Sequence, residues 1–382
     1  MAEFDMSLVQ RGARLRRSPY FEAEQRYNPL GYTMYNHMFF PIRFDDFEAE
    51  YRHLLEHVTL WDVSVERCVE ISGPDGFRFT QLMTPRDLST CEVGQAKYVL
   101  ITAPDGGILN DPVLTRMEEN RFWLALASSD VLFYAKGLAA FAGMDVRIRE
   151  ADVSPLQIQG PKSKDVVRDL FGEEILDLRY YFFRETEVDG IPVVVTRTGW
   201  TSEVGYEVYL CDGTRGAELW DKIMKVGEPY NIKPTGPSDI RRIEGGIFNW
   251  GADMTYENNP FEMGLERLVD LDMEADFVGK EALKRIRERG VSRRIVGVEL
   301  DGDRFPALNY TKWPVLAAGE HVGKVTSAIY SPRLEKNIGY AWVPAGLATE
   351  GTRLEVETEW GTRTATVAQM PFVDPTKQIP IS

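Results

Sequence analysis

Hydrophobic and polar positions alternate between a helical and a strand-like period along much of the chain. Residues 44–61 (FDDFEAEYRHLLEHVTLW) have helical periodicity, and residues 68–73 (CVEISG) predict a strand that ends at a Gly-Pro turn. The alternation continues in the next predicted elements, which are a helix within 73–83, three strands within 96–126 with hairpins at 104–107 and 117–120, a helix at 130–143 and a strand at 145–150. Antiparallel hairpins beside helices predict an α+β fold with helices layered on a sheet.

The pattern also shows a weak internal similarity and a change of class near residue 290. Residues 154–172 (SPLQIQGPKSKDVVRDLFG) repeat the order of strand, Gly-Pro turn and helix found at 69–83 (VEISGPDGFRFTQLM). This similarity predicts two related subdomains. After residue 290 only short strands with turns follow, as in 336–344 (KNIGYAWVP), which predicts a separate small barrel or sandwich. We therefore expect an α+β region of two interleaved subdomains at 1–290 and an all-β domain at 291–382.

One strand-like segment, residues 205–210 (GYEVYL), has a polar face that invites explanation. Successive strand side chains point to opposite faces, so the apolar residues share one face while Glu207 and Tyr209 share the other. A carboxylate beside a phenol, directly after a turn at 199–202, predicts the wall of a pocket for a flat ligand that donates hydrogen bonds. The alternative is the solvated face of an ordinary half-buried strand.

Residues 235–254 (TGPSDIRRIEGGIFNWGADM) combine a helix start with paired glycines that allow close backbone approach. Arg242 and Glu244 stand two positions apart and cannot face each other on a helix. We expect them to serve different partners, of which one could be Glu207 or a carboxylate of a ligand. A helix with solvated charges is the alternative.

Asp111 lies in the segment GGILNDPV, between a hairpin and a proline that ends strand pairing. A carboxylate in this place could be buried and poised for proton or amine chemistry. Because Asn-Asp-Pro is also an ordinary turn sequence, the pattern leaves both interpretations open.

Composition limits the class of protein. With 382 residues, 43% of them hydrophobic, the chain exceeds what one core normally supports, so two or three domains are expected. The formal net charge of -15 argues against nucleic-acid and anionic-membrane partners. The basic run at 11–19 (RGARLRRSP) precedes no apolar segment, and no stretch is long and apolar enough to span a membrane. We expect a cytoplasmic protein.

Cysteines and histidines predict neither a disulfide nor a metal site. The three cysteines lie far apart with no CxxC pair, which is typical of reduced thiols. His53 and His57 are one helical turn apart, but a helix with one apolar and one polar face explains them better than a metal does.

Several segments, taken in order, resemble the folate-dependent aminomethyltransferase (glycine cleavage T-protein) family. The resemblance covers nearly the whole chain and rests on GGILNDP, QGPKS, TRTGWTSEVGYEVYL, DIRRIEGG with GADM, NPFEMGLERLVDLD with FVGKEAL, and GKVTSAIYSPRLEKNIGYAWV. The segments YTMYNHMFFP, LWDVSVERCVEISG, QLMTPRDLS, LNDPV and SDVLFYAKGLA are similar to the tetrahydrofolate-dependent dimethylsulfoniopropionate demethylases within that family. The resemblance implies a three-domain ring around a central folate channel, with a β-barrel as the last domain.

The resemblance also implies roles for individual residues. Glu207 matches the carboxylate that holds the pterin, whose amino group and ring N–H offer two donors to one carboxylate. Asp111 matches the aspartate near the reacting nitrogens of the folate, and we expect it to be catalytic. The other cofactor-binding residues implied are Tyr98 in the channel, Trp200 in the turn, Tyr209 beside Glu207 and Arg242 in the helix.

The chain departs from the family pattern in three places. Ser238 stands where T-proteins have an arginine before the helix aspartate, and Val65 and Glu66 replace a His-Met pair. In the turn TGWTSEVG, Ser202 and Glu203 stand where the demethylases carry Lys-Gln. The last change removes a cation and adds an anion close to the expected channel, which leaves the identity of the methyl donor open.

The reaction that the resemblance implies moves a methyl group from a sulfonium donor such as dimethylsulfoniopropionate to N5 of tetrahydrofolate. A sulfonium methyl is electrophilic and leaves a neutral sulfide, so alignment and exclusion of water suffice, with Asp111 assisting electrostatically and no metal required. Aromatic faces could hold the cation. The expected substrate-binding residues are Tyr32, Tyr35, Trp61 and Trp200, with His37 as the acid that a methyl ether donor would need.

Two other functions stay open. The same folate site could take an N-methyl betaine or a methoxylated aromatic donor, and the fold could serve a folate-binding protein without catalysis, because fold does not determine function. Asp111 together with Glu207 favours an enzyme. We expect a small-molecule methyl donor as the partner, and a homodimer is left open.

Overall fold

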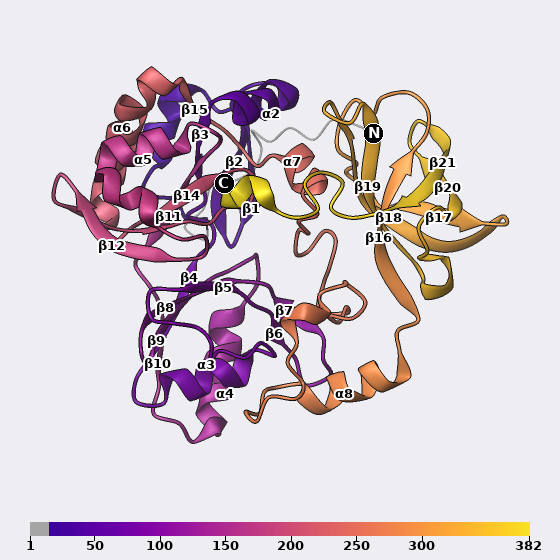
Figure 1. Ribbon diagram of the computed structural model, residues 1–382, viewed down its shortest axis with the longest axis horizontal. Helices are drawn as coiled ribbons and strands as arrows, with labels where there is room; N and C mark the ends of the chain where they lie inside the picture. The colour runs from indigo at the N-terminus through magenta and orange to yellow at the C-terminus, as the bar shows by residue number, and fades with distance from the viewer. Residues whose placement is uncertain (1–14) are drawn as a thin grey trace.

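The protein forms three lobes arranged around a common centre (Figure 1). The computed structural model describes residues 15–382, so part of the basic run at 11–19 lies outside the described residues. Two lobes combine helices with sheets and the third is a closed β-barrel, which confirms the predicted fold class. Within residues 15–382, no helix has the length and apolar character needed to cross a lipid bilayer.

The first lobe is built on a six-stranded sheet covered by helices. In spatial order its strands are β12 (Phe183–Val188), β13 (Ile191–Thr196), β14 (Gly205–Leu210), β11 (Ser154–Gln159), β3 (Val58–Asp62) and β15 (Ile232–Pro234). The helices of this lobe are α1 (Phe21–Glu24), α2 (Phe47–Glu56), α5 (Ser163–Phe171) and α6 (Gly216–Gly227). Apolar side chains of α5 and α6, among them Val166 and Trp220, share one core with Val208 of the sheet.

The second lobe has a five-stranded antiparallel sheet and two helices. In spatial order the strands are β10 (Arg147–Glu150), β4 (Cys68–Ser72), β9 (Arg121–Ala125), β8 (Val113–Glu118) and β5 (Ala96–Tyr98), and a small hairpin pairs β6 (Ile101–Thr102) with β7 (Ile108–Asn110). Helices α3 (Gly76–Met83) and α4 (Val131–Ala142) bury Phe79 and Ala135 against this sheet. Because β3 precedes this lobe and β11 follows it, the two α+β lobes are interleaved in sequence.

The third lobe is the barrel at the right of Figure 1. Its strands close in the order β16 (Arg293–Leu300), β19 (Lys336–Pro344), β18 (Glu320–Ser331), β17 (Trp313–Ala317), β20 (Arg353–Thr358) and β21 (Gly361–Ala368). Helix α8 (Lys280–Arg289) leads into it. Alternate side chains such as Val298, Val315 and Ala341 are fully buried and fill its core.

Three smaller segments, namely one hairpin and two short helices, lie among the three lobes. The hairpin of β1 (Gly31–Tyr35) and β2 (Met38–Arg43) belongs to the N-terminal part, and α9 (Gln378–Ile381) is near the C-terminus. Helix α7 (Asp239–Glu244) lies between the first lobe and the barrel in Figure 1, where Ile240 and Ile243 pack with the barrel residue Tyr340.

Two local predictions need correction. Residues 44–61 do not form one helix, because α2 ends at Glu56 and Val58–Asp62 form the buried strand β3, paired with β11 on one side and β15 on the other. The β-branched Val58 and Thr59 suit this sheet position. The three strands expected within 96–126 are divided into five, since Pro112 has no N–H to continue the ladder between β7 and β8. Both predicted hairpins are present.

Candidate functional site

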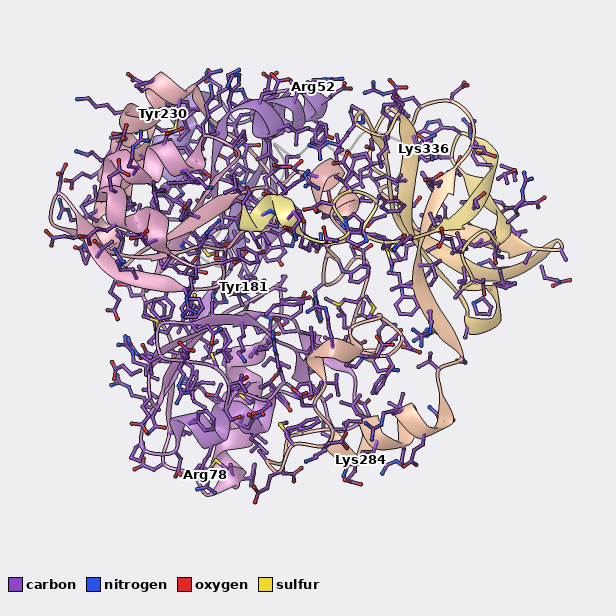
Figure 2. All side chains as sticks on the ribbon, in the orientation of Figure 1. Arg52, Arg78, Tyr181, Tyr230, Lys284 and Lys336 are labelled. Carbon is purple, nitrogen blue, oxygen red and sulfur yellow. The ribbon has the colours of Figure 1, made fainter. Side chains whose placement is uncertain are left out.

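A cavity of about 1460 Å³ lies where the three lobes meet. Its lining comes from every lobe, with Trp61 from the first, Asp111 from the second and Ile295 from the barrel as examples. Figure 2 places Tyr181, another lining residue, in the region between the two α+β lobes. Cavities that bind small molecules occur preferentially at such domain junctions.

Asp111 and Tyr98 form a hydrogen-bonded pair in the cavity wall. Asp111 follows β7 and Tyr98 ends β5, and the Tyr98 hydroxyl donates to Asp111 Oδ2 at 2.9 Å. Burial raises the pKa of Asp111 to about 7, although the hydrogen bond from Tyr98 acts in the opposite direction. Burial and the nearby Asp111 carboxylate raise the pKa of Tyr98. The arrangement places at the cavity a carboxyl group that can exchange a proton near neutral pH.

Glu207 is buried and not solvated. On its face of β14, Tyr209 packs against Trp123 of the second lobe with ring centroids 6.3 Å apart. The solvated-face alternative is therefore wrong. The Glu207 carboxylate accepts hydrogen bonds from Gln157 Nε2 at 2.7 Å, from Tyr209 at 3.3 Å and from two threonine hydroxyls. Burial raises the pKa of Glu207, and these hydrogen bonds oppose the rise.

Glu207 and Tyr209 stand directly behind the cavity lining, while Gly199 and Trp200 belong to it. The connection runs through Gln157, which donates to Glu207 and accepts from the Trp200 N–H at 3.4 Å. The pterin-binding role of Glu207 stays a prediction. It requires that the pterin reach Glu207 through the part of the cavity wall formed by Gly199 and Trp200.

Aromatic rings line one side of the cavity. Trp61 stacks on Phe40 with ring centroids 5.7 Å apart, and it lies 5.9 Å from Trp200. Tyr35 continues the row at 5.9 Å from Phe40, and all four rings line the cavity. Tyr32 also lines it. Four of the five predicted donor-binding side chains are thus brought to one cavity.

His37 is the exception. It lies in the turn between β1 and β2 with a φ of 63°, it is exposed, and it is not part of the cavity lining. The turn conformation directs it away from the site that the sequence suggested. The proposed role of His37 as an acid at the donor oxygen therefore has no geometric support.

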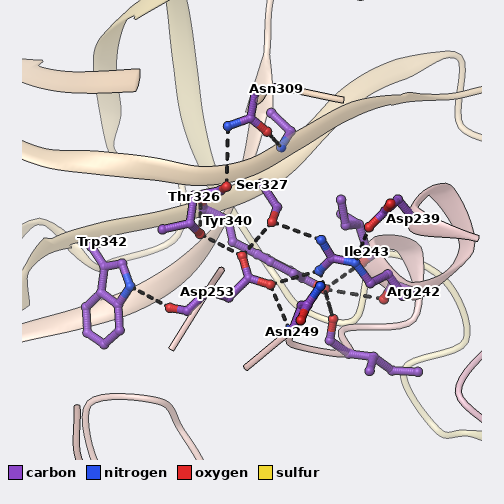
Figure 3. A network of polar contacts seen from close by, with 12 residues as sticks. Asp239, Arg242, Ile243, Asn249, Asp253, Asn309, Thr326, Ser327, Tyr340 and Trp342 are labelled. Carbon is purple, nitrogen blue, oxygen red and sulfur yellow. Dashed lines mark hydrogen bonds and ion pairs between the residues drawn. The ribbon is translucent and has the colours of Figure 1, made fainter. Parts of the chain in front are cut away.

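Arg242 links α7 to the barrel (Figure 3). Its guanidinium donates to Asp239 at 2.6 Å, to Asp253 at 2.8 Å and to Ser327 of β18 at 3.0 Å. The Arg242 guanidinium carbon lies 5.7 Å from the centre of a Trp200 ring, and Arg242 itself does not line the cavity.

Glu244 has other partners than Arg242, as predicted. It accepts from Tyr51 at 2.7 Å and from Ser331 at 2.6 Å. Neither residue binds Glu207, so that suggested pairing is wrong. Arg241, Arg242 and Glu244 of α7 are buried, so the alternative of a helix with solvated charges is wrong for them.

Glu203 does not add an unbalanced anion to the site. It is buried, and its carboxylate accepts from Arg241 Nε at 2.7 Å, with Arg333 at 3.8 Å. Arg241 of α7 is fully buried and balances the negative charge of Glu203, which the sequence left without a known partner.

Sequence reasoning assigned no site role to six charged residues of the lining, one of which is Asp239 at the start of α7. Glu66 lines the cavity from the turn between β3 and β4, and the signal for it in the sequence was its place in the pair Val65-Glu66 that departs from the family pattern. Four cations also line the cavity, namely Arg86, Lys97, Arg267 and Lys377. Burial lowers the pKa of Lys377 to about 8.

The rings of His53 and His57 lie next to each other, with centroids 4.9 Å apart. All three cysteines are free. His53 Nε2 lies 2.7 Å from the Asn231 carbonyl and His57 Nδ1 lies 3.1 Å from Lys162 Nζ. Within residues 15–382, no cluster of three or more His, Cys, Asp or Glu side chains could hold a metal ion.

Comparison with known proteins places this site in a family. The GCVT N-terminal domain matches residues 5–273, and the glycine cleavage T-protein C-terminal barrel domain matches residues 293–374. The glycine cleavage system aminomethyltransferase T from Bartonella henselae has the same fold, with a TM-score of 0.85 at 24% identity over 94% of this chain and 98% of that one.

Two curated relatives extend over nearly the whole chain. The chain is 38% identical to dimethylsulfoniopropionate demethylase of Ruegeria pomeroyi over 93% of this chain and 97% of that protein. It is 31% identical to an aminomethyltransferase of Bacillus cytotoxicus over 94% of this chain and 98% of that protein. The chain belongs to the glycine cleavage T-protein family. The predicted family and the prediction of an enzyme are confirmed, since both relatives are named for moving or removing a one-carbon group.

Proposed function

We propose that this protein is a tetrahydrofolate-dependent methyltransferase that takes a methyl group from a sulfonium donor such as dimethylsulfoniopropionate and gives it to N5 of tetrahydrofolate. The single observation that carries the proposal is the Asp111–Tyr98 pair in a cavity of about 1460 Å³, a volume larger than one small molecule needs. The 38% identity to a dimethylsulfoniopropionate demethylase supports the choice of donor.

The chain's side chains divide the task by position. Glu207, behind the wall that contains Trp200, would accept from the donor edge of the pterin. The rings of Tyr35, Trp61 and Trp200 would face the sulfonium by cation-π attraction. Asp111 lies on the second lobe, whereas Trp61, Trp200 and Glu207 lie on the first. The methyl donor and the folate would therefore meet between the two lobes, aligned and shielded from water.

The step conserves atoms and electrons without a metal. The sulfur–methyl bond breaks with its electron pair remaining on sulfur, while the N5 lone pair forms the new bond to carbon. The proton that N5 then carries must leave. Asp111, whose pKa is raised to about 7 by burial, is the carboxylate placed to accept it.

Two alternatives keep the folate site. An N-methyl betaine or a methoxylated aromatic compound could be the donor, and a folate-binding protein without catalysis would use the same cavity. The carboxyl group of Asp111 in the cavity favours catalysis over mere binding. A cytoplasmic location and a homodimer stay predictions.

The decisive experiment is an anaerobic assay of the purified protein with tetrahydrofolate and dimethylsulfoniopropionate, followed by mass spectrometry. We expect 5-methyltetrahydrofolate and methylmercaptopropionate in equal amounts. Folate binding without either product would reject the sulfonium donor, and a panel of betaines and methoxylated aromatics would then identify the true one.

A further inference from the structure

The turn between β3 and β4 presents a carboxylate to the cavity. The backbone N–H of Glu66 donates to the Val63 carbonyl at 2.9 Å, which closes the turn. Glu66, Val63 and Val65 all line the cavity beside Tyr35 and Trp61. The carboxylate is therefore held on a short turn between two sheet strands, next to the row of aromatic rings.

This carboxylate has no cationic partner among the described residues. No hydrogen bond or ion pair involves its oxygens, and the adjacent Arg67 is engaged by Glu150 at 3.0 Å. Arg86 and Lys377, two of the lining cations, donate instead to the carbonyls of Tyr98 and Gly245.

The charged groups that act on Glu66 are acids. Burial raises its pKa, and the carboxylates of Glu207 and Asp111 raise it further. The other titratable groups that sense Glu66 are Tyr35, Cys68 and Tyr209. Within residues 15–382, the charges that act on Glu66 are thus those of acids, and no cation is among them.

A partly buried carboxylate without a cation beside it is unfavourable, and a ligand cation that enters the cavity would relieve this cost. A ligand of the same shape whose sulfur or nitrogen is uncharged would not relieve this cost. The neighbouring aromatic faces favour a soft onium cation over a small hydrated one. We propose that Glu66 is the counter-charge that selects a methyl donor with a cationic onium centre over donors whose methyl-bearing atom is uncharged. This inference rests on the proposed function and adds to it the residue that determines donor charge.

The arrangement also accounts for release of the spent donor. Once the methyl group has left, the sulfur is neutral and its attraction to Glu66 is lost. Binding of the cation favours the ionised form of Glu66, so donor affinity should rise with pH, whereas affinity for the neutral sulfide should change little.

Calorimetry on the full chain tests the proposal with dimethylsulfoniopropionate and with methylmercaptopropionate, the demethylated product, which keeps the carboxylate but has an uncharged sulfur. For Glu66→Gln we expect onium affinity to fall by about tenfold to a hundredfold, with sulfide affinity and tetrahydrofolate affinity unchanged. Donor KM should rise far more than kcat falls. Glu66→Asp keeps the charge and should restore part of the affinity. Glu56→Gln, an exposed site outside the cavity, removes the same charge and should bind like wild type.

The possible failures are distinguishable. Equal onium affinity for wild type and Glu66→Gln, with both variants folded, would overturn the proposal. The proposal would also be overturned if the wild-type protein bound onium compounds, glycine betaine included, no more tightly than analogues whose sulfur or nitrogen is uncharged. A wild type that binds the onium selectively through Glu66 but yields no methylated folate would instead reject the proposed function and leave the charge selection standing.

Discussion

At the scale of single residues, burial decides the chemistry of this site. Asp111 and Glu207 are both carboxylates whose pKa is raised by burial, but they have different surroundings. Glu207 accepts hydrogen bonds from four side chains, whereas Asp111 accepts one from Tyr98 and faces the cavity. The well-satisfied Glu207 suits fixed recognition and Asp111 suits proton exchange.

Asp111→Asn should slow methyl transfer, because it removes the proton acceptor, and should stabilise the fold at neutral pH. In the folded protein the pKa of Asp111 is about 7, above its value in the unfolded chain, so the native state binds more protons and wild-type stability falls as pH rises between about 4 and 7. Asparagine removes that penalty. We expect the variant to be more stable by roughly 1–3 kcal/mol above neutral pH, with the difference vanishing below about pH 4.

Urea unfolding across this pH range measures the effect. A variant that is less stable than wild type at neutral pH would contradict the cost that burial imposes on the ionised Asp111 carboxyl group.

Tyr98→Phe should move the pH dependence of the reaction. The Tyr98 hydroxyl stabilises the ionised form of Asp111, so its removal raises the pKa of that carboxyl group further. The acidic limb of kcat/KM against pH should shift to higher pH by on the order of half a unit to one unit. Tyr134→Phe, which loses a hydrogen bond to the Thr102 carbonyl outside the cavity, is the matched control and should leave the limb in place.

At the scale of elements, α7 joins two lobes through charge. Arg242 on α7 meets Asp253, which in turn accepts from Thr326 at 2.8 Å and Ser327 at 2.6 Å on barrel strand β18 (Figure 3). A helix of six residues has little stability by itself, so these buried contacts and the apolar packing below it hold α7 in place.

Asp253→Ala should destabilise the protein by about 3–5 kcal/mol, because it leaves a buried guanidinium only partly paired. Arg294→Ala offers the control, since its ion pair with Glu266 at 3.2 Å is solvent-exposed and should contribute about 0–1 kcal/mol. Chemical denaturation monitored by tryptophan fluorescence compares the two. Equal losses would mean that the α7 link adds no more than a surface ion pair.

At the scale of the whole molecule, the cavity depends on all three lobes at once. A ligand that fills it contacts each of them and should stabilise the entire assembly rather than one part. The three lobes also explain why a chain of 382 residues has several cores instead of one.

Tetrahydrofolate at about a hundred times its Kd should raise stability by about 2.7 kcal/mol in wild type. Glu207→Gln should lose most of this increase, because the amide accepts from the pterin edge with one oxygen only. Glu187→Gln, on the exposed side of β12, removes the same charge, and this variant should keep the full increase in stability. Thermal unfolding with and without ligand measures both variants, and equal folate affinity for wild type and Glu207→Gln would remove the pterin assignment.

The sequence by itself determined the elements and the family. Local periodicity and turn chemistry predicted both hairpins of the second lobe, the helices α3, α4 and α5 and the all-β barrel, since these depend on neighbours along the chain. The ordered set of motifs along the chain, among them those around Asp111 and Glu207, indicated the family.

Only the tertiary structure decided how charges and strands are paired. The strand Val58–Asp62 forms because β11 and β15 flank it, against the helical period of its own segment. Arg241 balances Glu203, Asp253 holds Arg242, and Glu66 is left facing the cavity without a cation. These pairings join residues distant in sequence, and the free energy of a charge depends on burial and on partners that local patterns do not encode.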